Sequence, residues 1–348
     1  MDPDRLYEAW RDLRASTKGL HALEMAQRLG VSECELLASA CGREGAPSSV
    51  RLAADWPAFV ARLPSLGTVK AVTRNPNAVI EVIGTYDRIE FFGPMGQSVS
   101  SIDLRMFIHR WRHAFAFRDE TSRGTSRGIA FFDAQGDAVH KLFLREQSDA
   151  SAFHALVAAH TSQDQSPRQD VAPPAPPQAP KPDAQIDVPG LRTAWRAMTD
   201  THEFHGLLRR FDVQRTQALR LAGEDLARPA PTSSVSAVLE EVQRSTLPIM
   251  VFVGNPGNIQ IYSGPVRKVV RMGAWINVLD PGFDLHVRED HVTEAWVVRK
   301  PTADGVVTSL EAYDAAGELV ALLVGTRKPG QTENMGWRAT VEALPAPP

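Results

Sequence analysis

The feature that most constrains the fold is that the chain repeats itself. Four segments of the first half return in the same order in the second half, at offsets of 180 to 185 residues. The matched pairs are RLYEAWRDL with GLRTAWRAM, RNPNAVIEVIG with GNPGNIQIYSG, SIDLRMF with GFDLHVR, and AFFDAQGDAV with EAYDAAGELV. One short match can arise by chance, but four collinear matches indicate a tandem duplication. The 348 residues therefore predict two similar modules, each long enough to bury its own core.

The segment between the two copies has the composition of a linker. Residues 161–190 are rich in Pro, Gln, Asp and Ala and hold few large apolar side chains. Repeated proline favours an extended, solvated backbone over a packed core. We therefore predict an N-terminal repeat over residues 1–160, a linker over 161–190 and a C-terminal repeat over 191–348.

Each copy begins with helical periodicity and continues with strand patterns. The stretch LEMAQRLGVSECELLASA has apolar residues at three- and four-residue spacing, whereas VIEVIGTYDRIEFFG and later stretches alternate or are rich in aromatic residues. Asp-Gly, Gly-Asp and Ala-Gly turns between the later stretches favour antiparallel hairpins. The predicted fold is α+β, with a large antiparallel β-sheet in each half and helices packed at one face or end.

Composition narrows the classes of function. Apolar residues make up 43% of the chain and charged residues 23%, and no apolar run reaches the length of a membrane span. The N-terminal MDPDRLYEAWRDL lacks the apolar region of a secretory signal. We expect a cytoplasmic protein with no membrane insertion, and the net charge of −3 argues against a stable nucleic-acid partner. Cys34 and Cys41 have no second pair with which to form a zinc site, so we interpret them as buried thiols.

One stretch, MAQRLGVSECELL, has the helix, turn, helix pattern of a DNA-reading motif. Its second helix would present Glu33 and Glu35 to solvent. Recognition helices use Lys, Arg, Asn or Gln to contact base edges. A DNA-binding regulator is therefore the least favoured of the candidate functions.

Two histidines, His202 and His205, lie three residues apart in TDTHEFHGLL, which we interpret as the first turn of an amphipathic helix. On one helical face the two imidazoles could hold a transition metal together, but a stable site needs further ligands. Alternatively, Asp200 or Thr201 caps the helix and both histidines are surface residues. The residues alone leave these two interpretations open.

Basic side chains form a second group of candidates. At strand spacing Arg105 and Phe107 face the same side, which joins a cation to an aromatic surface; alternatively Arg105 pairs with a nearby carboxylate and Phe107 fills core. Other cations gather near predicted strand ends, where they either form a solvated rim or bind a dianionic ligand such as two propionates. These cations are Arg299, Lys300, Arg327 and Lys328.

Many of these motifs resemble the HemS/HmuS family, which includes ChuS- and PhuS-like members, of cytoplasmic hemin-degrading or hemin-transport proteins of Gram-negative bacteria. The similar segments are TRNPNAV, IDLRMFIHRW, FFDAQGDAVHK, FVGNPGNIQIYSGPV, MGAWINVLDPGFDLHVREDH, EAWVVRKPTADGVVTSLEAYDAAGEL and GTRKPG. They extend over nearly the whole chain outside the linker. The resemblance implies two structural repeats and one heme b bound between the C-terminal half and an arginine of the N-terminal half.

The resemblance also implies which residues contact heme. His202 matches the axial ligand of the iron, and Arg105 matches the arginine on the opposite face of heme, with Phe107 beside it. Three further residues match positions near heme and its propionates, and these are Lys300, Tyr313 and Arg327.

Two positions depart from the family pattern. His205 stands where an aromatic residue is expected, so it is either an alternative ligand or a substitution without effect. Ile80 stands where some members carry a histidine, which argues against a second ligand site in the first half.

The resemblance leaves two activities open. In the first, the protein opens the porphyrin ring to release iron, with Arg105 as the catalytic residue. This activity needs an external electron donor, because the chain has no Gly-rich dinucleotide fingerprint. In the second, the protein delivers intact heme to a separate heme oxygenase. An inner-membrane heme importer is a further expected partner.

Overall fold

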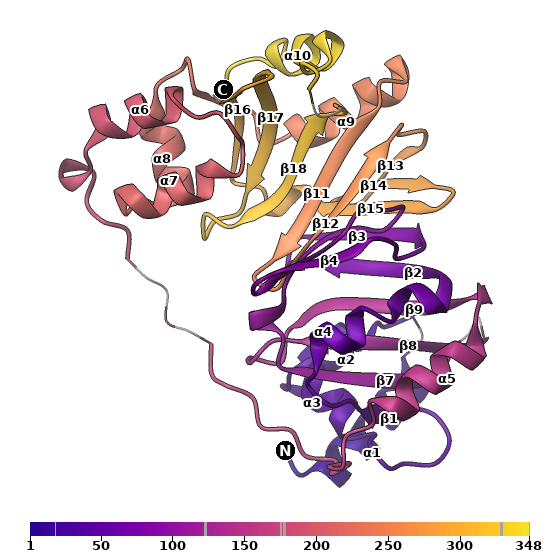
Figure 1. The fold of residues 1–348 in the computed structure, drawn as a ribbon. Coiled ribbons are helices and arrows are strands. Elements are labelled where there is room, and N and C mark those ends of the chain that lie inside the picture. Colours follow the sequence, from indigo (N-terminus) through magenta and orange to yellow (C-terminus); the bar gives the residue numbers. More distant parts are fainter. Residues whose placement is uncertain (18, 122–123, 175, 177–178, 328–329, 348) are drawn as a thin grey trace. The chain divides into compact units, whose positions relative to one another are not determined.

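The structure, a computed structural model, describes residues 1–17, 19–121, 124–174, 176, 179–327 and 330–347. Its elements are labelled in Figure 1, and they belong to two compact units. Unit 1 consists of Met1–Arg74, Glu81–Ala175 and Asn255–Gln260, and unit 2 of Asn75–Ile80, Pro176–Gly254 and Ile261–Pro348. Each unit therefore includes one short segment from the opposite half of the sequence.

Unit 1 begins with helices and continues with strands, as its periodicity predicts. Its helices are α1 (Pro3–Ser16), α2 (Ala22–Leu29), α3 (Glu33–Ala38), α4 (Trp56–Val60) and α5 (Ala150–Ala159), with short 3-10 turns η1 (Leu63–Leu66) and η2 (Ile108–Arg110). Its strands are β1 (Ser48–Arg51), β2 (Gly67–Arg74), β4 (Ile89–Phe92), β5 (Met95–Ser98), β6 (Asp103–Phe107), β7 (His113–Thr121), β8 (Gly124–Phe132) and β9 (Ala138–Ser148).

Unit 2 has the same succession of elements. Its helices are α6 (Val188–Arg196), α7 (Glu203–Phe211), α8 (Arg215–Ala222), α9 (Ser234–Ser245) and α10 (Met335–Glu342), with η3 (Asp183–Gln185) and η4 (Glu289–His291). Its strands are β10 (Ala227–Ala230), β11 (Ile249–Asn255, whose last residue belongs to unit 1), β13 (Val269–Met272), β14 (Trp275–Asp280), β15 (Phe283–Arg288), β16 (Glu294–Thr302), β17 (Gly305–Tyr313) and β18 (Leu319–Gly325). Strands β3 (Ala78–Gly84) and β12 (Asn258–Gly264) each have residues in both units.

The strands of both units are antiparallel and follow one order. In unit 1 the neighbours run β1-β7-β8-β9-β2, with a second group β4-β5-β6. In unit 2 they run β10-β16-β17-β18-β11, with a second group β13-β14-β15. Each strand of the first series corresponds to one of the second in chain order. The predicted α+β fold with two large antiparallel sheets from a tandem repeat is confirmed.

One matched motif forms the same turn in both units. In unit 1 the side chain of Asp133 accepts hydrogen bonds from the backbone N–H groups two and four residues later, each at 3.0 Å. In unit 2 Asp314 accepts the equivalent bonds at 2.9 and 3.0 Å. Gly136 and Gly317 follow with φ of 82° and 76°, a conformation that glycine adopts without strain. The repeated Asp and Gly therefore fix a hairpin turn in each copy.

The matched Asn-Pro segments provide the exchanged pieces of the two units. Within unit 1, Asn255 Nδ2 donates to the carbonyl oxygens of Arg74 and Val139, both at 2.9 Å. Within unit 2, Asn75 Nδ2 donates to carbonyl oxygens on two strands, at 3.2 Å to Gly254 and 2.9 Å to Val320. A side-chain amide that satisfies several carbonyls fixes the position of its backbone. The asparagine of each motif is thus a structural residue.

Gly257 shows how closely this segment packs in unit 1. A Cβ at this position would lie 2.5 Å from a methyl carbon of Val139. The carbonyl oxygen of Gly257 also accepts hydrogen bonds from Trp111 Nε1 at 2.8 Å and from the Phe107 N–H at 3.0 Å. Only glycine allows this approach of backbone to side chain. The carbonyl of Gly257 thereby fixes the end of β6, which carries Arg105.

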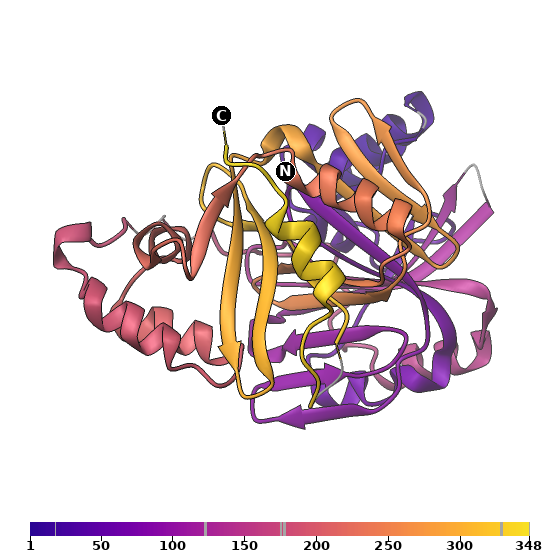
Figure 2. The ribbon, with the colours of Figure 1, turned by 90° about the horizontal axis from the view of Figure 1, so that it is seen from above.

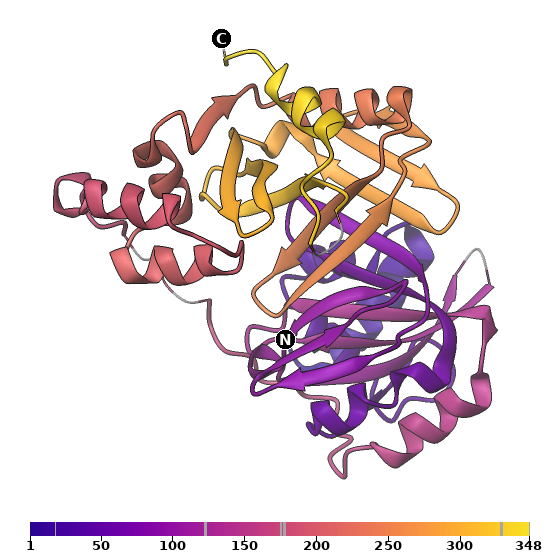
Figure 3. The same cartoon turned by 45° about the horizontal axis from the view of Figure 1, so that its top comes forward.

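Helices pack in different ways within unit 2. Helices α9 and α10 lie side by side against β17 and β18 (Figure 2). Helices α6, α7 and α8 form a separate group beside β10 and β16 (Figure 3). The apolar faces of this group meet in one buried cluster that includes Trp195, Phe204 and Trp296. This cluster is the base on which the histidine-bearing helix α7 rests.

The predicted linker makes hydrogen bonds at both of its ends. In unit 1, the Arg51 Nη2 donates to the carbonyl oxygens of Ser166 and Arg168, at 2.8 and 2.9 Å. In unit 2, Arg220 pairs with Asp183, and helix α6 already begins at Val188, with Asp187 as its N-cap. The last residues of the predicted linker are therefore helical, and the boundaries at 160 and 190 stay predictions.

Two smaller expectations concern the cysteines and the bilayer. Both Cys34 and Cys41 are buried free thiols, as interpreted from the sequence. Burial raises the pKa of the Cys41 thiol, so it stays protonated and unreactive at neutral pH. Among the described residues, no helix combines the length and apolar character needed to cross a bilayer.

Candidate functional site

The histidine pair lies at the start of helix α7, but the helix begins later than the sequence predicts. Glu203 is the first helical residue and His202 is its N-cap, whereas residues 199–202 form a bend and a turn. The alternative interpretation, in which Asp200 or Thr201 caps the helix, is therefore wrong. Glu203 stabilises the turn instead, because its carboxylate accepts hydrogen bonds from Thr199 N at 3.1 Å and Thr199 Oγ1 at 2.8 Å.

Asp200 has a different role from a helix cap. Its Oδ1 accepts two hydrogen bonds from His202, one from the backbone N–H at 2.8 Å and one from the ring nitrogen Nδ1 at 2.6 Å. These bonds, with a smaller effect of the charge of Arg327, hold the pKa of Asp200 below its usual range. The ionised carboxylate can only accept, so Nδ1 carries a proton, and in the neutral form of the ring Nε2 then has the free lone pair. The His202 side chain is 88% exposed, which leaves Nε2 accessible.

The outward face of α7 is polar and open. His205 and Gly206 are exposed on this face, as are Arg209 and Arg210 one turn further on. A Cβ at Gly206 would meet no atom within 4 Å, so the packing of the protein does not require glycine there. Glycine inside a helix costs about 0.5–1 kcal/mol relative to alanine. The helix therefore has a bare surface one turn beyond His202.

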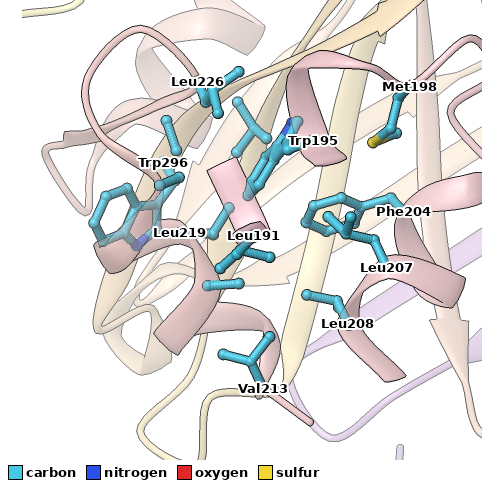
Figure 4. Close-up of a cluster of buried hydrophobic side chains, with 14 of the residues drawn as sticks. Leu191, Trp195, Met198, Phe204, Leu207, Leu208, Val213, Leu219, Leu226 and Trp296 are labelled. Carbon is cyan, nitrogen blue, oxygen red and sulfur yellow. The ribbon is translucent and has the colours of Figure 1, made fainter. Parts of the chain in front are cut away.

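The inward face of α7 is apolar and fixes the helix. Phe204 packs edge-to-face on Trp195 of α6, with ring centroids 4.5 Å apart. Leu207 and Leu208 fill the remaining space between the helices, and Figure 4 shows these side chains together in the buried cluster. Burial of side chains of this size contributes about 1.5–3 kcal/mol each. The direction of α7, and so the position of His202, follows from this packing.

A buried charged network lies beneath Phe204. Its centre is the carboxylate of Glu311, which is fully buried. The Lys300 ammonium donates to Oε1 at 2.5 Å, and the Arg215 guanidinium donates to Oε2 at 2.7 and 3.0 Å. Both cations also face the Phe204 ring, with Lys300 Nζ 4.7 Å and Arg215 Cζ 5.3 Å from its centroid. Two cations share one anion, so the network has one net positive charge.

Tyr313 completes the network. Its hydroxyl donates to Glu311 Oε2 and accepts a hydrogen bond from Arg215 Nε at 2.7 Å. Burial, and then the charge of Glu311, raise the pKa of Tyr313 well above its usual value, so the phenol stays a donor. Burial alone would raise the pKa of Glu311, but the positive charges of Arg215 and Lys300 lower it well below its usual range. The carboxylate is therefore ionised at neutral pH.

Sequence reasoning named Lys300 and Tyr313 but missed Arg215 and Glu311. One signal was available in the repeat alignment, where Glu311 takes the place of the buried Ala130 in the first copy. A carboxylate at a position that is apolar in the other copy indicates a buried partner of opposite charge. Arg215 is 96 residues away, and nothing in the local sequence links the two residues.

The remaining predicted cations of unit 2 have different surroundings. Arg327 is partly exposed, with Nη1 3.8 Å from Asp304 Oδ2, and its effect on Asp200 places it on the His202 side of the unit. Arg299 is occupied by Glu342, at 2.6 Å. Lys328 lies outside the described residues. Of the described residues in this predicted set, Arg327 thus has the greatest freedom to meet a ligand near His202.

Arg105 and Phe107 lie on β6 in unit 1. The burial of β6 alternates, and both side chains are on its half-exposed face, as their spacing predicts. The guanidinium of Arg105 pairs with Asp103 and donates to the Leu104 carbonyl oxygen at 3.0 Å. Arg105 is opposite Gln97, and in unit 2 the equivalent pair is His286 and Asn277. The first copy alone therefore presents a cation at this position.

A metal site made by protein ligands alone finds no support in the described part of the chain. There, no group of three or more His, Cys, Asp or Glu side chains has an arrangement that could hold a metal ion. An exposed imidazole supplies one ligand to iron, and a tetrapyrrole supplies four nitrogens of its own. The donor set at His202 therefore fits an iron porphyrin better than a bare ion.

Comparisons with known proteins agree with the duplicated architecture. A family model described as the haemin-degrading HemS.ChuX domain matches the chain twice, over residues 30–160 and 212–344. The hemin transport protein HmuS of Yersinia pestis is 40% identical over an alignment of 344 residues, and the match covers 97% of each chain. The hemin transport protein HemS of Yersinia enterocolitica is 39% identical over an alignment of 341 residues, and this match also covers 97% of each chain.

Solved structures match over the full length. Holo-PhuS, a heme-binding protein from Pseudomonas aeruginosa, has a TM-score of 0.95 and 46% identity, and the match covers 99% of this chain and 100% of PhuS. The heme degrading enzyme ChuS of Escherichia coli O157:H7 has a TM-score of 0.90 and 35% identity, with 98% and 99% covered. The fold described above is thus shared with both proteins.

Proposed function

Since the chain belongs to the family of haemin-degrading HemS/ChuX-domain proteins, we propose that it binds heme in bacterial heme uptake, with His202 as the axial ligand of the iron. One observation carries the choice of ligand. His202 is exposed at the start of α7, and its Nδ1 is engaged by Asp200 while Nε2 remains accessible. A neutral imidazole binds iron through the nitrogen that has no proton. The predicted cytoplasmic location is part of this proposal.

The surface around His202 has room for a planar ligand. Gly206 presents no side chain, and the space in front of it is open. A macrocycle held by His202 can therefore lie close to α7. Once bound, heme supplies the redox chemistry of its iron, and the protein supplies orientation and charge. His205, exposed one turn along the same helix, is the candidate for a second and weaker attachment point.

Positive charge on the His202 side suits the two propionates of heme. Arg327 is the residue that we assign to direct contact, because it is partly exposed and its ion pair with Asp304 is long, at 3.8 Å. Lys300 and Tyr313 are buried and bonded to Glu311, so we assign them an indirect role. The net positive charge of their network attracts a dianion from beneath Phe204. Direct contact would require Lys300 to leave Glu311.

Arg105 is proposed as the catalytic residue, with Phe107 beside it. A guanidinium on the half-exposed face of β6 can donate hydrogen bonds to a polar ligand of the iron. Phe107 provides an apolar surface that excludes water from that side. Replacing Arg105 with Ala should leave heme binding largely intact and slow ring opening. Equal turnover in the variant, at equal heme occupancy, would remove Arg105 from this role.

Two activities remain candidates, and relatives favour each of them. ChuS is described as a heme degrading enzyme, whereas HmuS and HemS are described as hemin transport proteins. We propose degradation with an external electron donor as the first candidate. The alternative is delivery of intact heme to a separate heme oxygenase, after receipt from an inner-membrane importer.

The binding proposal is tested by titrating the apoprotein with hemin and following the Soret band. His202→Ala should weaken binding and change the spectrum, because the ring nitrogen is lost as a ligand. The double variant His202→Ala with His205→Ala removes both candidate ligands. An unchanged spectrum in the double variant would exclude this assignment.

The choice between the two activities needs a product analysis. The heme complex is incubated with a reductase, or with ascorbate plus catalase, while Soret absorbance and pigment are followed. Catalase is essential because free peroxide destroys heme without an enzyme. A biliverdin-type pigment supports degradation. Intact heme that passes to apomyoglobin, with no pigment formed, supports delivery.

A further inference from the structure

We infer that Asp200 is a positioning residue for the iron ligand, which selects the tautomer and the ring orientation of His202. The inference rests on the proposed role of His202 and goes beyond it. It states why this histidine is the ligand and which neighbour makes it one.

The carboxylate of Asp200 accepts two hydrogen bonds from His202. The same oxygen, Oδ1, accepts from the backbone N–H at 2.8 Å and from Nδ1 at 2.6 Å. These two bonds close a small ring that includes χ1 and χ2 of the histidine, so the imidazole cannot rotate without breaking one of them. A carboxylate bond to N–H of this length belongs to the stronger, charge-assisted class.

The backbone around Asp200 is itself fixed. The Asp200 carbonyl oxygen accepts from the Glu203 N–H at 3.1 Å, and the Thr199 carbonyl oxygen accepts from the Ala303 N–H at 2.8 Å. The second bond joins this turn to the loop between β16 and β17. Because both sides of Asp200 are bonded, its carboxylate is held in place before any ligand arrives.

The hydrogen bond from Nδ1 to Asp200 determines which tautomer of His202 is available to bind iron. Either ring nitrogen of a neutral histidine can carry the proton, and only the other one can bind a metal. A carboxylate at Nδ1 requires the proton there, which leaves the lone pair of Nε2 free. Without Asp200 part of the His202 population would have Nε2 protonated and unable to bind. A carboxylate partner also makes the imidazole a stronger donor, which favours ferric over ferrous iron.

His202 and His205 differ in whether a carboxylate orients the ring. Within the described residues, His205 has no hydrogen bond to a carboxylate, although it is exposed on the same helix as His202. Its tautomer and rotamer are therefore not preset. Of two exposed imidazoles, the one oriented in advance binds at a lower entropic cost.

The first test uses the ligand-free protein. Nitrogen-15 NMR of the histidine rings should show His202 almost entirely with the proton on Nδ1. In Asp200→Ala the two tautomers should mix, while Asp200→Asn, whose amide oxygen can still accept, should keep most of the Nδ1 form. Asp212→Asn is the matched control, because Asp212 ends the same helix, loses the same charge and makes no contact with His202.

The second test measures ferric heme binding. Loss of an outer-shell partner of a metal-bound histidine weakens binding about 10- to 100-fold, and we expect this loss in Asp200→Ala. Asp200→Asn should retain more affinity but raise the reduction potential, because the acceptor is no longer charged. Circular dichroism and thermal unfolding verify that each variant is folded. The Asp212→Asn control should match the wild-type protein in all readouts.

The outcomes distinguish this inference from the proposed function. If Asp200→Ala keeps the Nδ1 tautomer, or binds heme within about twofold of wild type, Asp200 does not position the ligand. His202→Ala would still lose binding in that case, and the proposed function would stand. If the double variant His202→Ala with His205→Ala binds heme as tightly as wild type, the ligand assignment of the proposed function itself fails.

Discussion

The buried carboxylate of Glu311 allows a quantitative test of how unit 2 holds its ligand-bearing helix. Glu311→Gln keeps the shape of the side chain and removes its charge. The carboxylate accepts from Lys300 and Ser309 on one oxygen and from Arg215 and Tyr313 on the other. Glutamine has a single acceptor oxygen, so one pair of donors would face an N–H₂ group. The buried Lys300 and the half-buried Arg215 would also lose their counter-charge.

The size of the loss follows from this geometry. Removing one partner of a buried ion pair costs about 3–5 kcal/mol, and Glu311 is fully buried. Whole proteins have unfolding free energies of about 5–15 kcal/mol. Unit 2 should therefore unfold at a clearly lower temperature. Removing Lys300 as well, in Lys300→Met with Glu311→Gln, should destabilise less than the sum of the two single changes.

The assay is differential scanning calorimetry of the apoprotein, because two compact units need not unfold in one transition. Glu318→Gln is the matched control, since Glu318 lies exposed on the turn between β17 and β18. It should shift stability by no more than about 0.5 kcal/mol. A loss below about 1 kcal/mol in Glu311→Gln would refute the reasoning. Full additivity of the losses from Glu311→Gln and Lys300→Met in the double variant would also refute it.

Two further predictions concern other residues. Burial lowers the pKa of His140 to about 3, whereas a histidine in the unfolded chain has a pKa of about 6.5. As the pH falls, the unfolded chain therefore takes up this proton before the folded protein does. The free energy of unfolding should fall by up to about 1.4 kcal/mol per pH unit between pH 6.5 and pH 3. Urea unfolding at pH 7 and 5 measures this slope, and an equal slope in His140→Gln would contradict it. Gly206→Ala should stabilise the apoprotein by about 0.5–1 kcal/mol, because its Cβ meets no atom within 4 Å, while Gly206→Leu should weaken heme binding. Wild-type affinity in the Leu variant would show that heme does not approach this surface.

Much of the fold can be predicted from the sequence because duplication doubles each signal. The paired motifs predict two antiparallel sheets, and the Asp and Gly of FFDAQGDAV and AYDAAGELV form the same turn in both units. The common face of Arg105 and Phe107 follows from a two-residue period and is confirmed. Such features depend on residues close in sequence, so a local pattern reveals them.

The parts that could not be predicted depend on distant residues. In RKPTADG, Lys300 has the pattern of a surface cation. In the structure it is buried, because it forms an ion pair with Glu311 on the neighbouring strand β17. The sequence predicts too early a start for α7, because aspartate often caps helices. In the structure the Asp200 carboxylate instead accepts a hydrogen bond from the imidazole of His202. The exchange of the Asn-Pro segments leaves no mark on periodicity, because it depends on hydrogen bonds between residues that are 179 and 181 positions apart in the sequence.

The exchanged Asn-Pro segments have a consequence for any isolated half of the chain. Residues 1–160 alone would retain the acceptors that Asn255 satisfies, the carbonyl oxygens of Arg74 and Val139, and would also carry a donor of the same kind in Asn75. Two copies of such a fragment can complete each other by domain swapping. A single-repeat protein with this motif therefore carries both the donor and the acceptors needed to pair with a second copy of itself, and a tandem duplication places two such copies in one polypeptide.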